Sequence, residues 1–556
     1  MVSRVFKTVM ASNSVHSTPD SSAMEDAVRF YQAAAQGQPN PSETSAYKSV
    51  DPLAFEMSRV PMRTPRPLKI VCCGAGISGL NLAHEVETGS FANCELKIYE
   101  KNSDLGGTWF ENRYPGCAFY TGSQDIYNYL KDVADQHNLG QYIKLSHKII
   151  GAKWFEERQK WQIQIVQTDG RELVVSDGET KDGEKGEPFI EECDIFINAS
   201  GAYNNWRWPA IPNRETYRGN MMHSAAWPDA DYVTGRTVTL IGNGSSGIQI
   251  LPAILDKADK IHVMLRSKTW VTPSLANRFA GENGANKIYT DNEKEGWAKD
   301  PEAYYRYRKE IENELNARFR LYLKDSKAQK MGREVTKQQM IGKLSAKPEL
   351  ANDLIPDFPV GTASGRQVNS DTIICATGFN MGFVPRFPIL GSDGRDLREV
   401  WTKELPTAYL SVTVNKMPNY FVMMGPQSPL GHGSITGSIE KVTGYIQKLV
   451  YKLQTEGYAS LVPRQVVTGA WVAHAMKWME KTVWVEGCAS SFKNGSSGRT
   501  VVSLHPGSRL HYFNLLERPR YEDFEWTPLS ADPSSMFAWL GDGFTAAEGS
   551  VGADLS

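Results

Sequence analysis

Two glycine-rich turns of the form Gly-x-Gly-x-x-Gly constrain the fold of this chain more than any other feature. Their glycines are Gly74, Gly76, Gly79, Gly242, Gly244 and Gly247. Such glycines let the backbone turn sharply and approach a pyrophosphate, while the helix that follows offers free N–H groups to the negative charge. Two such turns on one polypeptide predict two dinucleotide-binding units, with electrons passing between the two bound dinucleotides.

The first turn lies between two strand-like segments, which is the setting that a dinucleotide site requires. Residues 68–73 form a short apolar run before the turn, and residues 77–86 carry apolar side chains at helical spacing. Residues 95–100 then alternate as a second strand that ends in Glu100, 21 positions after the last glycine of the turn. An acid at this position accepts hydrogen bonds from ribose hydroxyls, so we predict that role for Glu100.

The second turn repeats this plan with one difference. Residues 237–241 form the strand before it, residues 248–255 the helix, and residues 260–265 the strand after it. The last strand is followed by Arg266 instead of an acid. A guanidinium pairs with a 2′-phosphate that an acid would repel, so the second dinucleotide is predicted to be NADPH rather than NADH. The alternative is that Arg266 only faces solvent at the end of the strand.

Composition sets limits on the rest of the chain. With 556 residues, of which 41 % are apolar, the chain is too long for one core, and two or three domains are expected. A net charge of −2 gives no overall basic field, so neither a nucleic acid nor an anionic membrane is indicated as a partner. No apolar run approaches the ~20 residues that span a bilayer.

The seven cysteines contain no Cys-x-x-Cys pair and no metal-ligand spacing. No metal site is therefore predicted. Free thiols are the favoured state, which indicates a reducing, cytoplasmic compartment.

A third motif lies between the two turns. Residues 217–228 read Tyr-Arg-Gly-Asn-Met-Met-His-Ser-Ala-Ala-Trp-Pro, which matches the pattern Phe/Tyr-x-Gly-x-x-x-His-x-x-x-Trp-Pro. Through this pattern the chain, from about residue 68 to residue 526, resembles the flavin-dependent type I Baeyer-Villiger monooxygenases, particularly those of fungal secondary metabolism. Segments similar to flavin-domain motifs of that family are found at residues 106–109, 112–116, 376–379, 425–431 and 484–487.

The resemblance implies a reaction and its participants. NADPH would reduce FAD, and the reduced flavin would use O2 to convert a small-molecule ketone into an ester or lactone, as expected for secondary-metabolite biosynthesis. Nucleic acid and a membrane span are not implied, and the oligomeric state is not specified.

The resemblance and the two turns together nominate the site residues. The FAD candidates are Gly74, Gly76, Ser78, Gly79, Glu100, Gly107, Thr108, Trp109 and Tyr114. The NADPH candidates are Gly242, Gly244, Ser245, Ser246, Gly247, Arg266 and Ser267. Two residues are catalytic candidates. His223 would couple nicotinamide movement to the flavin domain or serve as a purely structural linker, and Arg113 would supply a cation near the flavin or support the flavin loop.

These assignments predict an α/β fold with two Rossmann-like dinucleotide-binding domains, one for FAD and one for NADPH, and a helical insertion in the second. The insertion is placed at residues 291–347, which are highly charged and carry apolar residues at helical spacing. Residues 372–376 are interpreted as a strand at which the chain has returned to the first domain. The predicted divisions are a mobile N-terminal arm at 1–66, the FAD domain at 67–216 and 362–530, the NADPH domain at 217–361, and a C-terminal tail at 531–556.

The chain departs from the family pattern at two places, and each looks like an internal deletion. After residues 112–116 an acid typical of the family is missing, and Tyr120 takes roughly its place. After residues 358–361 the chain passes directly to residues 362–366, so the arginine that stabilises anionic oxygen intermediates in the family has no counterpart. A lost oxyanion partner costs about 3 to 4 kcal/mol, so we expect oxygen insertion by this chain to be impaired.

Three explanations for these departures stay open: segments missing from the gene model, divergence to another flavin reaction, and loss of activity. The alternative functions are therefore an N-hydroxylating flavin monooxygenase and a catalytically impaired dinucleotide-binding homologue.

Overall fold

The computed structural model describes residues 58–118, 121–174, 180–203, 205–265, 268–272, 276–281, 287–355, 369–379, 382–431, 433–485, 492–493 and 500–550. Arg266, Ser267, Tyr120 and residues 356–368 lie outside this set, as do residues 1–57. No helix of the described part has the length and apolar character that crossing a bilayer requires.

The first domain is built on a parallel sheet of five strands. In spatial order these are β13 (Tyr420–Val422), β7 (Ile195–Asn198), β1 (Leu68–Cys73), β2 (Cys94–Tyr99) and β3 (Ile143–Lys144). Helix α3 (Ile77–Glu87) connects β1 to β2 and packs beside α12 (Ile435–Thr455), whose buried face carries residues such as Val442, Ile446 and Leu449. The predicted strand–turn–helix–strand unit is confirmed: apart from Lys69, the residues of β1 are apolar, and Leu68, Ile70, Val71 and Cys72 are buried in the parallel sheet.

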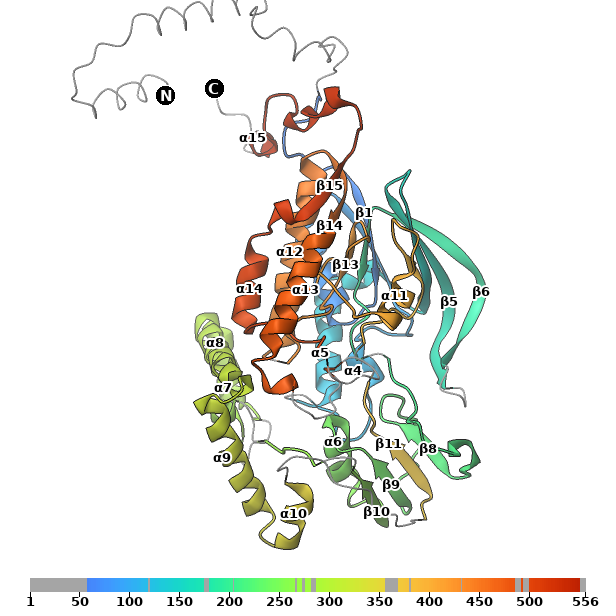
Figure 1. The fold of residues 1–556 in the computed structure, drawn as a ribbon, viewed down its shortest axis with the longest axis vertical. Coiled ribbons are helices and arrows are strands. Elements are labelled where there is room, and N and C mark those ends of the chain that lie inside the picture. The colour runs from blue at the N-terminus through green and yellow to red at the C-terminus, as the bar shows by residue number, and fades with distance from the viewer. Residues whose placement is uncertain are drawn as a thin grey trace, which may run out of the picture.

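A second, mostly antiparallel sheet covers the other face of this domain (Figure 1). It consists of β12 (Ile389–Leu390), β4 (His147–Phe155), β5 (Lys160–Val174) and β6 (Thr180–Cys193). Its alternating strands place Trp154 and Trp161 against Phe196 and Tyr420 of the parallel sheet. The indole N–H of Trp161 donates to the carbonyl of Pro418 at 2.7 Å, so this fully buried ring also has its polar group paired.

The second domain is a smaller parallel sheet in the lower part of Figure 1. Its strand order is β10 (Lys260–Met264), β9 (Thr237–Ile241), β11 (Thr372–Cys375) and β8 (Asn220–His223), and α6 (Ser245–Ile254) follows β9. The interpretation of residues 372–376 as a return to the first domain is wrong, because β11 pairs with β9 and β8. The boundary predicted at residue 362 therefore lies too early.

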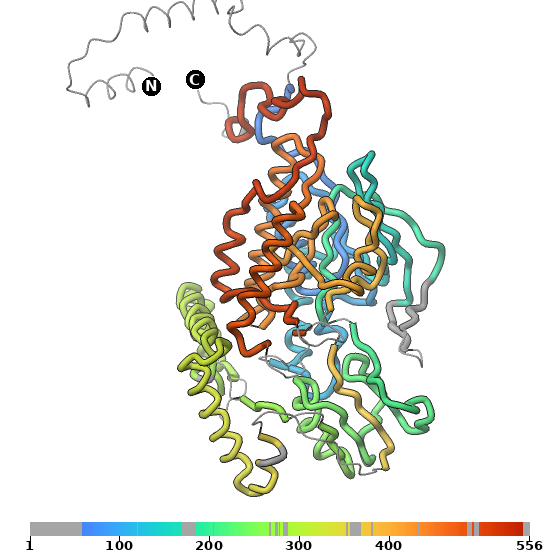
Figure 2. The backbone as a smooth tube through the Cα atoms, in the orientation of Figure 1, coloured from blue at the N-terminus to red at the C-terminus, as the bar shows by residue number. Residues whose placement is uncertain are grey.

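The predicted helical insertion is present, and it packs against C-terminal helices of the first domain. Its helices are α7 (Asp291–Lys299), α8 (Pro301–Ala317), α9 (Lys327–Lys343) and α10 (Ala351–Leu354). Tyr322 stacks on Trp484 with ring centroids 4.7 Å apart, and Phe319 stacks on Trp478 of α13 (Gln465–Met479). Lys324 N–H also donates to the Lys481 carbonyl at 2.9 Å. In Figures 1 and 2 the insertion accordingly lies beside α13 and α14 (Arg509–Glu517).

The described chain begins and ends at the same place (Figure 2). Pro61 pairs with Gly541, and Met62 N–H donates to the Phe544 carbonyl at 2.7 Å. Arg66 donates to the Tyr458 carbonyl at 2.9 Å, where β14 (Tyr458–Pro463) pairs antiparallel with β15 (Phe524–Pro528). The arm predicted for residues 1–66 therefore ends before residue 61, since residues 61–66 are fixed to the body of the protein.

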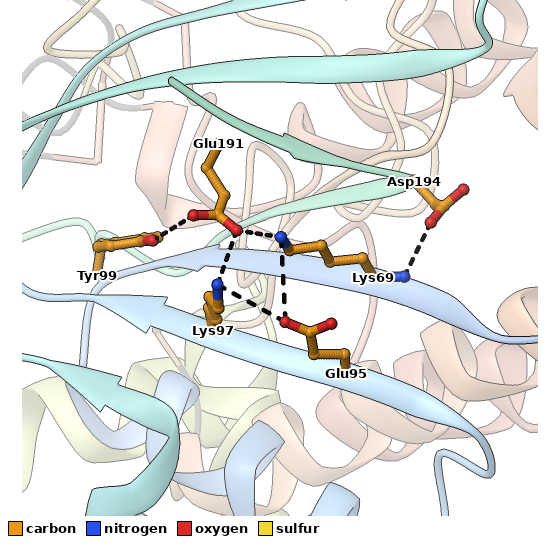
Figure 3. A network of polar contacts seen from close by, with 6 residues as sticks. All are labelled: Lys69, Glu95, Lys97, Tyr99, Glu191 and Asp194. Atoms are coloured by element: carbon orange, nitrogen blue, oxygen red, sulfur yellow. Dashed lines mark hydrogen bonds and ion pairs between the residues drawn. The ribbon is translucent and has the colours of Figure 1, made fainter. Parts of the chain in front are cut away.

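An ion cluster joins the two sheets of the first domain (Figure 3). The Glu191 carboxylate on β6 accepts from the ammonium groups of Lys69 and Lys97, the latter at 2.9 Å, and from the Tyr99 hydroxyl at 3.0 Å. Burial alone would raise the pKa of Glu191, but these three donors lower it below its ordinary value. The carboxylate therefore stays charged and holds β6 to β1 and β2.

Replacing Glu191 with glutamine should lower the free energy of unfolding by about 2 kcal/mol, because two lysines lose their charged partner. Because the folded-state pKa is lowered, the contribution is present above the unfolded pKa of about 4.3 and is lost as pH falls below it. Denaturant melts at several pH values measure both effects. The neighbouring Glu192 is the matched control: its side chain is 41 % exposed and pairs with exposed Arg158, so Glu192→Gln should change stability by less than about 1 kcal/mol.

Candidate active site

The first glycine turn is closed by backbone contacts that leave no room for side chains at Gly74 and Gly79. Gly74 has φ +104°, and a Cβ there would lie 2.8 Å from the Ala199 carbonyl oxygen at the end of β7. A Cβ on Gly79 would lie 2.1 Å from the Gly74 carbonyl oxygen. Gly76 then caps α3 in an extended conformation, with no side chain bonded to the first N–H groups of the helix. Ser78 lies in this first helical turn.

The second turn has the same geometry. Gly242 has φ +107° and would place a Cβ 2.4 Å from the Ala376 carbonyl oxygen at the end of β11, while Gly247 would place one 2.3 Å from Gly242. Gly244 caps α6 with φ −73° and ψ −169°, against −76° and −170° at Gly76. Ser245 and Ser246 begin this helix. The segment at residues 376–379, assigned from sequence to the flavin domain, therefore faces the second turn instead.

Glu100 follows β2 beside the first turn, as predicted. Its carboxylate accepts from the backbone N–H groups of Ala75 at 2.8 Å and Asn102 at 2.9 Å, and its side chain is buried. Burial raises the pKa of Glu100 while these two hydrogen bonds oppose the rise. The acid thus fixes the conformation of the turn, and its predicted contact with a ribose stays a prediction.

A loop from the first domain lines the first turn. Gly107 has φ +53°, and a Cβ there would lie 2.9 Å from the Gly76 Cα atom. The short helix α4 (Thr108–Glu111) starts at this point, and Trp109 at its beginning packs against the cores of both domains. Gly107 is therefore brought to Gly76, and Thr108 and Trp109 follow it in α4; contact of these residues with FAD stays a prediction.

The same loop continues into the junction between the domains. Tyr114 is buried, and its hydroxyl donates to Oε1 of Gln249 on α6 at 2.9 Å. Gln249 in turn donates to the Ala118 carbonyl at 2.9 Å, and a Cβ on Gly116 would lie 2.4 Å from the Gln249 carbonyl oxygen. Burial raises the pKa of Tyr114 to about 12, so its hydroxyl keeps its proton. The helix after the second turn is thereby joined to the loop that lines the first.

His223 ends β8 and is 1 % exposed. Its Nδ1 accepts from the Ala225 N–H at 3.1 Å, so Nε2 carries the proton and donates to the Thr377 hydroxyl at 3.2 Å. The ring stacks on Trp206, with centroids 4.4 Å apart and planes at 11°. Burial lowers the pKa of His223 to about 4, so the imidazole is neutral near pH 7.

This buried neutral histidine predicts how stability depends on pH. The folded-state pKa is about 4 and the unfolded-state pKa about 6.5, so the unfolded chain binds more protons between these values. Stability should therefore be complete above pH 6.5 and fall by up to about 3 kcal/mol as pH decreases to 4. His505 contributes with the same sign, because burial lowers its pKa to about 3. His223→Asn should make thermal melts less pH-dependent, whereas substitution of the exposed His137 should not.

Arg113 is exposed, and its guanidinium lies 4.9 Å from the Phe110 ring centroid. This position favours the structural role proposed for Arg113, support of the flavin loop, over a role as a cation inside the site.

The structure also reveals residues that the sequence did not nominate. A cavity of about 40 Å³ opens at the ends of β7 and β13 and is lined by polar Asn198, Ser200 and Arg386 and by apolar Phe383 and Met424. The pair of tryptophans around Arg207 was the only sequence signal for the ring that stacks on His223.

The site offers no metal centre in the part of the chain that the structure describes, since no group of three His, Cys, Asp or Glu side chains converges there. The residues present fit dinucleotides instead. Side chains are sterically excluded at Gly74, Gly79, Gly242 and Gly247, and both helices begin without a side-chain cap, so their N–H groups are available to a phosphate. Nothing lies within 4 Å of a Cβ at Gly244, which leaves an open approach to the second helix.

Comparison with known proteins agrees with this geometry. A family model described as flavin-binding monooxygenase-like matches residues 110–391, and one for an NAD(P)-binding Rossmann-like domain matches residues 72–138. The FAD-binding monooxygenase stcW of Emericella nidulans is 32 % identical and covers 88 % of this chain and 88 % of its own length. A Baeyer-Villiger monooxygenase of Streptomyces coelicolor is 24 % identical over 88 % of this chain and 98 % of its own.

Solved structures show the same fold. The crystal structure of OTEMO in complex with FAD and NADP superimposes with a TM-score of 0.68 at 19 % identity, covering 84 % of this chain and all of that chain. Cyclohexanone monooxygenase from Rhodococcus sp. Phi1 bound to NADP+ gives 0.66 at 20 % identity, with the same coverage. The chain belongs to the flavin-binding monooxygenase-like family, as a flavin-dependent monooxygenase of the Baeyer-Villiger type that uses FAD and NADPH.

Proposed function

We propose that this protein inserts one atom of O2 beside the carbonyl carbon of a small-molecule ketone, in the cytoplasm, as a step in the biosynthesis of a fungal secondary metabolite. The balanced reaction is ketone plus NADPH, H+ and O2 to ester or lactone plus NADP+ and water. The observation that carries the proposal is the joining of two geometrically equal dinucleotide turns through the Tyr114–Gln249 junction.

Each turn is assigned one cofactor. The first would hold FAD through Gly74, Gly76, Ser78, Gly79, Glu100, Gly107, Thr108, Trp109 and Tyr114. The second would hold NADPH through Gly242, Gly244, Ser245, Ser246, Gly247, Arg266 and Ser267. When bound, FAD and NADPH supply the hydride and the oxygen chemistry that protein side chains lack.

The protein's own groups would orient the two cofactors and exclude water from the site. The uncapped N-termini of α3 and α6 attract the two pyrophosphates. Tyr114 fixes α6 to the loop that lines the first turn, which would hold the two cofactor-binding turns in a constant relation to each other. His223, neutral and stacked on Trp206, ties β8 to Thr377 beside the second turn and adds no charge to the site. These contacts support the structural alternative for His223, and its coupling to nicotinamide movement stays a prediction.

The purified full chain tests the proposal. We expect it to bind FAD, to be reduced anaerobically by NADPH in preference to NADH, and to form an ester or lactone from members of a ketone panel under air. Because the segment with the family arginine has no counterpart, we expect most NADPH to yield hydrogen peroxide, with ester formed about a hundredfold more slowly than flavin is reduced. A chain that binds no FAD, or one that hydroxylates amines and oxidises no ketone, would overturn the proposal.

A further inference from the structure

Helix α9 turns two different faces to its surroundings. Gly332, Thr336 and Met340 repeat every four residues and form its inner stripe, where Thr336 and Met340 are buried. A Cβ on Gly332 would lie 2.7 Å from the Leu321 side chain of the preceding segment, so this stripe is packed closely. The opposite face has no covering element among the described residues and points to solvent.

Basic side chains outnumber acids on the outer face of α9. The helix as a whole carries five basic side chains and one acid, a net charge of +4 in a chain whose total is −2. The acid, Glu334, lies on the outer face and accepts from the Gln338 amide at 2.8 Å, so with Lys327, Lys330 and Lys337 this face has a net charge of +2. All five basic side chains are exposed, and none has an ion-pair partner within the described part of the chain: Lys327, Lys330, Arg333, Lys337 and Lys343. In α7, by contrast, Lys294 pairs with Asp291 and Lys299 pairs with Glu295.

Large apolar side chains lie among these charges. Met331 is 62 % exposed, Val335 48 % and Ile341 42 %. Met331 follows Lys327 by four residues and Ile341 follows Lys337 by four, so apolar and basic side chains share one face of the helix. Burying these apolar side chains against an apolar partner would be favourable in free energy.

We propose that the outer face of α9, defined by Lys327, Lys330, Met331, Val335, Lys337 and Ile341, binds the surface of an anionic membrane. The lysines attract acidic phospholipid headgroups, while Met331, Val335 and Ile341 insert at the boundary of the acyl chains. The helix would then lie in the plane of the interface, and the attachment is reversible. This inference does not depend on the proposed ketone reaction.

The pattern favours a membrane over a nucleic acid. Phosphate backbones attract the same charges, but they give no reason for exposed Met331 and Val335, and four of the five basic residues are lysines without interleaved aromatic rings to stack on bases. A lipid interface accounts for both kinds of side chain, because its headgroups attract the lysines and its acyl chains accommodate the apolar side chains.

Sedimentation of the full, flavin-loaded chain with lipid vesicles tests the proposal. We expect it to sediment with vesicles of phosphatidylcholine containing about 30 % phosphatidylserine, to stay in solution with phosphatidylcholine alone, and to be released by high salt. Lys327→Glu/Lys330→Glu/Lys337→Glu should weaken binding by about a hundredfold or more. Met331→Gln/Val335→Gln, which keeps the charge, should weaken it by about tenfold.

Matched controls distinguish the effect of this face on vesicle binding from effects of net charge and of misfolding. Lys294→Glu/Lys299→Glu/Lys309→Glu makes the same change in charge on α7 and α8 and should bind vesicles like the unmodified chain. Melting temperature and flavin content should be equal in all variants. Failure to sediment with acidic vesicles, equal loss in the control variant, or binding to RNA that the Met331/Val335 variant leaves unchanged would each overturn the proposal.

Discussion

Replacing Gly79 with alanine should give a protein that is purified without FAD and whose free energy of unfolding is lower by about 3 kcal/mol. The new methyl carbon would lie 2.1 Å from the Gly74 carbonyl oxygen, and Gly74 is itself held against the Ala199 carbonyl oxygen. Neither neighbour is a flexible side chain, so the turn must open and α3 must move from the pyrophosphate position. Flavin absorbance per protein and denaturant melts measure the two losses.

Two further alanine variants make this result specific. Gly247→Ala produces the equivalent clash at the second turn, 2.3 Å from the Gly242 carbonyl oxygen, so this variant should retain FAD but lose reduction by NADPH. Gly469→Ala lies in α13 with nothing within 4 Å and should retain both. A Gly79→Ala protein with a full complement of FAD would contradict the assignment of FAD to the first turn.

The local units of both domains could be predicted from the sequence. Their strands are short apolar runs that end at a glycine turn, and the helices after them have a clear apolar spacing, so local periodicity determines them. The predicted strands at residues 68–73 and 237–241 are confirmed residue for residue by β1 and β9. These are also the elements that place the two sets of glycines.

The pairing of strands that are distant in the sequence could not be predicted in the same way. Strand β11 is an apolar tetrad, Thr-Ile-Ile-Cys, and nothing in these four residues specifies which parallel sheet it joins. In the structure β11 lies between β9 and β8, and the Ala376 carbonyl that follows it lies against the second turn as the Ala199 carbonyl lies against the first. The similarity of residues 199–201, Ala-Ser-Gly, and 376–378, Ala-Thr-Gly, was the available signal.

At the site, too, features set by local spacing could be predicted and contacts between distant residues could not. The glycines and Glu100 follow from spacing, but the Tyr114–Gln249 hydrogen bond joins residues 135 positions apart and depends on how the domains pack. The stacking of His223 on Trp206 likewise depends on the conformation of an irregular loop, which a sequence pattern does not predict. Arg266 and Ser267 lie outside the described residues, so their contact with a 2′-phosphate stays a prediction.

Arg509→Met should lower the free energy of unfolding by about 3 kcal/mol and slow anaerobic flavin reduction by about tenfold or more. The guanidinium is 3 % exposed at the start of α14, where it pairs with Glu312 and donates to the Asn316 amide oxygen at 3.0 Å, both on α8. It also donates to the Ser434 carbonyl at 2.9 Å, directly before α12. One side chain therefore joins the helical insertion to the flavin domain, and its loss leaves acceptors from both without their donor.

The kinetic effect follows because hydride transfer requires the two bound rings to meet within a narrow range of distance, which the joined domains set. Glu312→Gln should cost only about 1 kcal/mol, since the Glu312 carboxylate is 39 % exposed and solvent screens its pairing. Arg306→Met is the matched control, because Arg306 and its partner Asp300 are both exposed and their pair should contribute almost nothing. Stopped-flow reduction and denaturant melts distinguish the outcomes: a variant that is less stable but reduced at the original rate would limit Arg509 to a structural role.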